Sequence, residues 1–178
     1  MRKHFIGIAV FAVITLGWAL LYQPNPHPSD AALIDYFQKH RAGFDKLARM
    51  AQEDSNVQAI YSDQVMLINY KIWPKDTEEG FTKQRWSEYQ NVFAKLKEYH
   101  VNIFTKASGV HISVSSDFSD TDDYGSIMIE KGYAYSLVEP APLVESLDNM
   151  GFDNKGTYYR KIDEHWYLYH EWSVDEPE

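Results

Sequence analysis

The segment DTDDYGSIMIEK, residues 120–131, has the length and several of the residues of a calcium-binding loop. A loop of this kind takes oxygen ligands at positions 1, 3 and 5, a glycine at position 6 and a bidentate glutamate at position 12. The first, third and sixth residues fit, but Tyr124 stands at position 5 and Lys131 places a cation at position 12. The loop motif is therefore not matched, and the segment predicts an acidic turn between two strands.

The carboxylates around this turn leave a looser metal site open, because clustered carboxylates bind a hard cation without the loop motif. Its candidate ligands are Asp117, Asp120, Asp122 and Asp123. Calcium is the cofactor that this alternative implies, whereas the favoured expectation is that the protein has no cofactor.

A second group of polar and aromatic residues lies in DEHWYLYHEW, residues 163–172. Alternate residues of a strand point to opposite faces. One face of this strand would carry His165, Tyr167, Tyr169 and Glu171. Rigid rings with polar ends suit a contact surface, so this face is a candidate binding surface. An ordinary amphipathic sheet surface is the simpler alternative.

Local catalytic motifs are absent from the sequence, which has no GxSxG, SxxK or HExxH motif and no phosphate loop. It also has no cysteine, which removes thiolate nucleophiles and cysteine-based zinc sites. Catalytic triads are defined by geometry, so a site built from a histidine and a carboxylate far apart in sequence stays open. The sequence favours a protein that is not an enzyme, with a hydrolase as the alternative.

Two amphipathic helices are predicted in the first half of the chain. Ser29 has the character of an N-cap, and apolar residues then recur every three or four positions over 30–54. A second helix is predicted over 83–99. Between them, the apolar run 65–73 predicts one buried strand.

The second half of the chain is rich in β-forming residues. Strands are expected over 101–107 and 110–116, with a hairpin around residues 130–132 and another around 163–164. This succession predicts an α+β fold in which the two helices pack on an antiparallel sheet of about five to seven strands.

Charge and composition exclude one class of partner. The net charge of −9 would repel phosphate backbones, so we expect no binding to nucleic acid. Hydrophobic content of 44% and charged content of 24% fit a folded globular domain.

The N-terminal sequence carries the clearest indication of location. Arg2 and Lys3 precede the uncharged run 5–22, which is long enough to cross a bilayer as a helix. We therefore predict a signal-anchor over 1–23, with a cleaved signal peptide as the alternative. A proline-rich spacer over 24–28 and an exported α+β domain over 29–178 follow. The positive-inside rule predicts a single-pass bacterial inner-membrane protein with a cytoplasmic N-terminus and a periplasmic domain.

Three segments carry a resemblance: PSDAALIDYFQKHRAGFDKLARM, KGYAYSLVEPAPLVESLD and WYLYHEW. In outline they resemble short bacterial envelope proteins with no assigned activity. The resemblance implies a place in the cell envelope and implies no catalytic residues.

Together these features predict a membrane-tethered, periplasm-facing, non-catalytic binding module that acts by protein contact, in an accessory or an inhibitor-like or immunity-like role. Its partner would be another envelope or secreted protein, and its N-terminal helix would contact the membrane. The alternatives are an envelope hydrolase with a non-local histidine and carboxylate, and a protein that binds calcium or a small ligand.

Overall fold

Helix α2 (Asp30–Glu53) is the first element of the computed structural model and confirms the first predicted helix. The structure describes residues 27–96, 101–107, 109–121, 125–151 and 154–175. The side-chain oxygen of Ser29 accepts a hydrogen bond from the amide of Ala32 at 3.2 Å, as expected of an N-cap. One stripe of the helix is buried and includes Leu33, Phe37, Phe44 and Leu47.

Helix α3 (Lys83–Phe93) begins where the second helix was predicted, after the N-cap Thr82. The Thr82 side chain accepts a hydrogen bond from the amide of Arg85 at 3.1 Å. The helix ends at Phe93 rather than near Tyr99, and residues 97–100 lie outside the described part of the chain. Tyr89 and Val92 form its buried side.

The strands of the described residues join one antiparallel sheet in the order β3-β2-β1-β4-β5-β6-β8-β7. The strands are β1 (Val57–Ile60), β2 (Val65–Leu67), β3 (Ile72–Trp73), β4 (Asn102–Lys106), β5 (Gly109–Thr121), β6 (Gly125–Tyr135), β7 (Gly156–Lys161) and β8 (Trp166–Asp175). The sheet has eight strands, so the predicted number of about five to seven was wrong.

One source of this error is the apolar run 65–73, which is a hairpin and not a single strand. The amide of Tyr70 donates to the Leu67 carbonyl at 2.9 Å, and the amide of Leu67 donates to the Lys71 carbonyl at 3.0 Å. These two hydrogen bonds close a tight turn between β2 and β3. Apolar content alone does not reveal such a turn.

The hairpin predicted around residues 130–132 was also wrong, because strand β6 continues through these residues without a turn. A Cβ atom at Gly132 would clash with the carbonyl oxygen of Ile112 and lie 2.9 Å from the Cα atom of Ser113. The glycine is thus required by the close approach of β5 and not by a turn.

The membrane-spanning helix that the fold prediction included is not among the helices of the structure. Within the described residues, no helix combines the length and the apolar character needed to cross a bilayer. The predicted span, 5–22, lies outside the described residues. Over the described residues, the fold is therefore corrected to two helices on an eight-stranded sheet.

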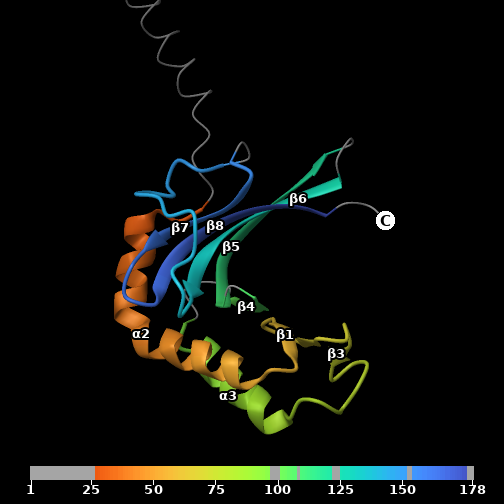
Figure 1. Ribbon diagram of the computed structural model, residues 1–178. Coiled ribbons are helices and arrows are strands. Elements are labelled where there is room, and N and C mark those ends of the chain that lie inside the picture. The colour runs from red at the N-terminus through yellow and green to blue at the C-terminus, as the bar shows by residue number, and fades with distance from the viewer. Residues whose placement is uncertain (1–26, 97–100, 108, 122–124, 152–153, 176–178) are drawn as a thin grey trace, which may run out of the picture.

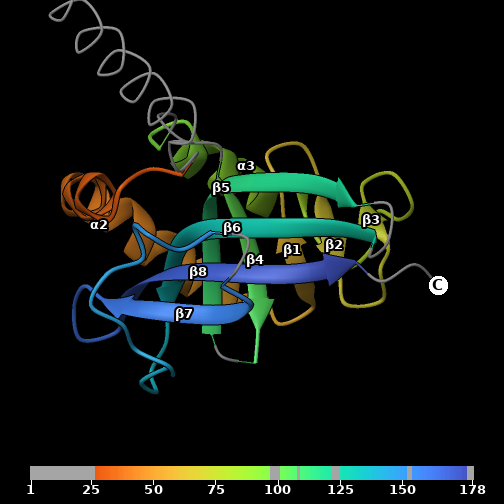
Figure 2. The ribbon, with the colours of Figure 1, turned by 90° about the horizontal axis from the view of Figure 1, so that it is seen from above.

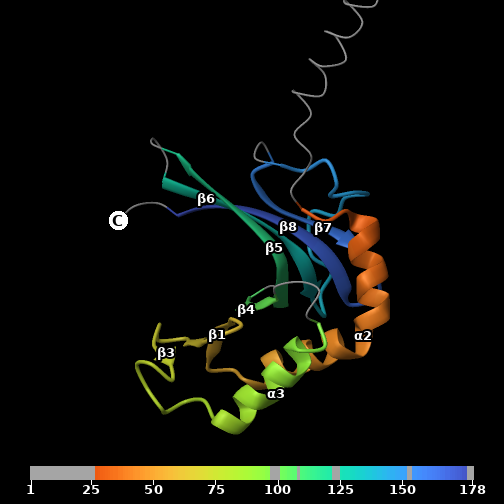
Figure 3. The same ribbon diagram turned by 180° about the vertical axis from the view of Figure 1, so that it is seen from behind.

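Both helices lie on the same side of the sheet, as Figures 1 and 3 show. Helix α2 lies beside the part formed by β5, β6, β8 and β7, and α3 lies beneath the part that contains β1 and β3. Viewed from above, β5, β6, β8 and β7 run across β1, β2 and β4 at a steep angle, so the sheet is strongly bent (Figure 2). The main core fills the space between the sheet and the helices.

Aromatic rings dominate this core where α2 meets β6 and β8. The rings of Phe44 and Tyr133 lie 4.5 Å apart, and those of Phe37 and Trp166 lie 5.1 Å apart. The Trp166 indole also donates to the carboxylate of Asp45 on α2 at 2.9 Å. Ring packing and this hydrogen bond together fix the helix on the sheet.

Candidate functional site

The predicted Tyr/His/Glu face of β8 is largely covered. Tyr167 and Tyr169 are only 1% and 0% exposed, and they pack with Ala134 and Tyr159 of the flanking strands. The side chain of His165, just before β8, is 37% exposed, whereas that of Glu171 is 18% exposed. The side chains of neighbouring strands pack against these two tyrosines, which are therefore enclosed and do not form a contact surface.

Tyr169 and Glu171 belong instead to a polar cluster that spans four strands. The cluster consists of Lys106, His111, Glu130, Tyr169 and Glu171. The Lys106 ammonium lies 2.5 Å from a carboxylate oxygen of Glu171, and that oxygen lies 3.8 Å from Nδ1 of His111. The Tyr169 hydroxyl donates to Glu130 at 3.4 Å.

Burial sets the protonation of this polar cluster. It lowers the pKa of His111 to about 3, with a further contribution from the charge of Lys106, so the ring is neutral at pH 7. Burial raises the pKa of Glu130; Lys106 opposes this shift and Glu171 adds to it. Two carboxyl groups in unlike environments are an arrangement that acid–base enzymes use. Glu130 is only 3% exposed, however, so the cluster reaches solvent chiefly at Lys106 and Glu171.

A second charged group lies on the helix-facing side of the sheet and joins the start of α2 to β6 and β7. Asp30 and Lys131 are both fully buried, with Nζ of Lys131 2.8 Å from one carboxylate oxygen of Asp30. Arg160 contacts the other oxygen at 2.6 Å. Lys131 also lies 3.1 Å from Asp148. We call these four residues the Asp30 network.

The charges of the Asp30 network are matched. Burial by itself would raise the pKa of Asp30, but hydrogen bonds from Lys131, the Leu147 amide and Arg160 lower it to about 2. The amide of Asp30 in turn donates to Asp148 at 2.6 Å. The two buried charges, Asp30 and Lys131, each have an opposite charge beside them, so the network holds α2 on the sheet.

His170 lies near this network with its side chain fully buried. Its ring stands 6.4 Å from that of His27, edge to face. Burial, His27 and Lys131 lower its pKa to about 4. Within the described residues, no group of three or more metal-ligating side chains comes together.

Two of the four acidic residues of the looser calcium site, Asp117 and Asp120, lie within the described residues. The backbones of Asp117 and Asp120 belong to β5 and pair with Ile129 and Ser126 of β6. Asp122 and Asp123 lie outside the described residues. Pairing between β5 and β6 continues as far as Thr121, opposite Gly125.

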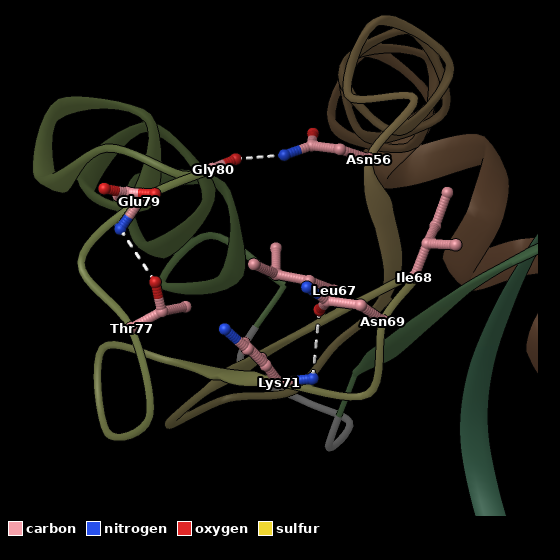
Figure 4. A pocket seen from close by; sticks show the side chains of 8 residues that line it. All are labelled: Asn56, Leu67, Ile68, Asn69, Lys71, Thr77, Glu79 and Gly80. Atoms are coloured by element: carbon pink, nitrogen blue, oxygen red, sulfur yellow. Dashed lines mark hydrogen bonds between the residues drawn. The ribbon is translucent and has the colours of Figure 1, made fainter.

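An open pocket of about 370 Å³ lies beside the β2–β3 turn (Figure 4). It is lined by Asn56, Leu67, Ile68, Asn69, Lys71, Thr77, Glu79 and Gly80. The Asn56 side chain donates to the Gly80 carbonyl across one end, and the Ile68 amide donates to the Asn56 carbonyl at 3.0 Å. Small-ligand and side-chain pockets start at roughly this volume.

The turn beside this pocket exposes two large side chains. Ile68 is 60% exposed and Tyr70 is 73% exposed. Tyr70 also has a φ angle of 62°, in the left-handed region that glycine and asparagine adopt most easily. We refer to Ile68, Tyr70 and the adjoining pocket as the turn surface.

The sequence did not predict the turn surface, because the run 65–73 was interpreted as one buried strand. The Asn69–Tyr70 pair before Lys71 was the available signal, since asparagine favours turns. A second exposed apolar pair, Leu137 and Val138, follows β6 and is 69% and 77% exposed. This pair borders a pocket of about 500 Å³, in which Gly109, and no residue with a side chain, has a positive φ angle.

No protein-family model, curated protein or solved structure matches the chain. The resemblance to bacterial envelope proteins therefore stays a prediction.

Proposed function

We propose that the protein is a non-catalytic binding module that acts by protein contact, and that the turn surface is where its partner binds. The main observation in support of this proposal is the exposure and backbone conformation of Tyr70. This residue has a large side chain, 73% exposed, and is held in a backbone conformation that costs a non-glycine residue roughly 1–2 kcal/mol. Strain of this kind persists where the surrounding structure imposes it, and it concentrates at functional positions.

The surroundings of Tyr70 support a contact role. Tyrosine is among the residues that contribute most to binding energy in protein interfaces, because its ring buries a large area and its hydroxyl keeps a polar contact. Ile68 adds an exposed apolar side chain two residues earlier in the same turn. The adjoining pocket has room for one or two side chains of a partner.

The polar cluster supports a weaker, second candidate, a hydrolase with a non-local histidine and carboxylate. Glu130, whose pKa is raised by burial, would be the acid, and His111 with the nearby carboxylate of Glu171 would complete the site. Replacement of Glu130 by glutamine should then abolish hydrolysis of chromogenic esters or glycosides by the purified chain. If the unmodified chain hydrolyses neither class, this candidate is discarded.

The test of the main proposal measures stability and binding in the same variants. Tyr70→Gly should raise the free energy of unfolding by roughly 0.5–1 kcal/mol, since glycine accepts the left-handed conformation without strain. The same change should reduce partner capture. Capture is measured with a photo-crosslinking amino acid at position 68 in intact cells, with and without Tyr70→Gly.

Val138→Ser is the matched control, because Val138 is equally exposed but lies outside the turn surface. It should change neither capture nor stability. A loss of stability in Tyr70→Gly would show that Tyr70 serves the fold, and the absence of any crosslinked partner at position 68 would remove the proposal.

A further inference from the structure

Strand β5 extends well beyond the strand that pairs with one of its edges. Its last pair with β4 joins Ser113 to Asn102. On the other edge, pairing with β6 continues to Thr121, opposite Gly125. Among the described residues, no strand pairs with the β4-side edge of β5 after Ser113. In Figure 2 this half of β5 is the outermost strand of its layer.

The uncovered edge is long enough to bind a peptide. Residues 114–121 span about 27 Å at roughly 3.4 Å per residue. Along an antiparallel strand, about half of the backbone amides and carbonyls point to each side. The uncovered side thus offers a row of hydrogen-bonding groups of the kind that receives an added strand.

The two outer edges of the sheet differ from this one. Strand β3, at one end, has only two residues. Strand β7, at the other end, is covered by the segment 142–144: the Val144 amide donates to the Tyr159 carbonyl at 2.8 Å, and the Tyr159 amide donates to the Pro142 carbonyl at 3.0 Å. Among the described residues, the two outer edges of the sheet are short or covered, whereas the outer half of β5 has no strand paired along one edge.

Charge identifies the kind of segment that fits. The sequence VSSDFSDTDD, residues 114–123, contains four aspartates and no lysine or arginine. A second copy of the same strand would add carboxylates and no cation to this edge, so no register of strand pairing could place opposite charges together. A strand that carries lysine or arginine would pair with opposite charges instead.

We propose that the outer half of β5 binds an extended, basic peptide segment of another protein by strand addition. This edge is separate from the turn surface, so the inference goes beyond the proposed function and does not depend on Tyr70. It also gives a role to the acidic sequence at the end of the β5–β6 hairpin.

The experiment uses the full-length chain and a labelled octapeptide of alternating lysine and threonine at physiological ionic strength. Fluorescence anisotropy measures binding, and amide hydrogen exchange locates the peptide. We expect saturable binding and exchange slowed by about tenfold or more within residues 114–121. Alternating glutamate and threonine should bind at least about tenfold more weakly. A lysine and threonine peptide with every backbone amide N-methylated should not bind, since it lacks the donors that pair with a strand.

Two double substitutions distinguish peptide binding at this edge from non-specific attraction of a basic peptide to the acidic chain. Asp117→Lys with Asp120→Lys should reverse the preference, so that the glutamate peptide binds better than the lysine peptide. Glu78→Lys with Glu145→Lys makes the same change in net charge at exposed positions elsewhere and should preserve the preference for lysine. Protection outside residues 114–121, equal binding of both peptides, no binding at all, or a dimer of the chain that protects β5 would each overturn the proposal.

Discussion

His170 is a buried base that stays neutral in the folded protein. Lys131 of β6 and His27 of the segment before α2 are the titratable groups that lower its pKa to about 4, beyond the effect of burial. His111, on the opposite face of the sheet, has its pKa lowered to about 3. In the unfolded chain both rings would titrate near the usual value of about 6.5.

This difference predicts a loss of stability as the pH falls. Below about pH 6.5 the unfolded chain binds protons at both histidines while the folded chain does not, so the stabilisation is present above that pH and is lost towards the folded pKa values. Each histidine should remove up to about 1.4 kcal/mol between pH 6 and pH 5. Urea unfolding at each pH, followed by tryptophan fluorescence, measures the slope.

His170→Phe should reduce that slope by about half, because one of the two titrating rings is gone. His165→Phe is the control on the same strand segment, since its side chain is 37% exposed. An unchanged slope in His170→Phe would mean that this ring titrates alike in both states.

At the scale of elements, the start of α2 depends on the Asp30 network. Lys131→Met would leave the buried carboxylate of Asp30 without its closest lysine, and loss of one partner of a buried pair costs about 3–5 kcal/mol. Asp30→Asn in the Lys131→Met background should restore part of this loss. Urea unfolding of the single and double variants measures both effects as a double-mutant cycle.

The surface pair of Lys39 and Asp35 is the control for this cycle. These side chains are 65% and 63% exposed, so Lys39→Met should cost less than about 1 kcal/mol. Equal losses in Lys39→Met and Lys131→Met would contradict the importance assigned to the buried network.

Gly132 gives a second prediction at this scale, which concerns the close approach of strands β5 and β6. Gly132→Ala would push a Cβ atom against the β5 backbone, where no flexible side chain can yield, and should cost about 1–3 kcal/mol. Gly151→Ala has open space around the added Cβ atom and should be nearly neutral. Thermal unfolding compares the two, and a neutral Gly132→Ala would show that the strands can separate there.

For the molecule as a whole, the sequence predicted elements well where one face of a segment is buried. The apolar stripe of α2 and its cap at Ser29 were enough to place that helix. Strands with both faces covered were harder, because burial on both sides removes the alternation on which such predictions rest. Tyr167 and Tyr169 were therefore expected at a surface but are enclosed.

The sequence could not predict which polar side chains contact each other, because the partners are far apart along the chain. Arg160 and Asp30 are separated by 130 residues and meet only through the order of strands β6, β8 and β7. The same holds for Lys106 and Glu171, which are 65 residues apart. Tyr70 was missed for a local reason, since tyrosine rarely adopts a left-handed backbone and its residue type does not indicate one.

Strand β6 places two consecutive residues of opposite charge, Glu130 and Lys131, in two different buried surroundings. Glu130 lies 3.4 Å from the Tyr169 hydroxyl on one face, and Lys131 lies 2.8 Å from Asp30 on the other. A slip of β6 by one position during folding would exchange these faces and bring each charge beside a like one. A misaligned register of the central strands would therefore be unfavourable on both faces of β6. The two adjacent charged residues thus favour the correct register of the sheet.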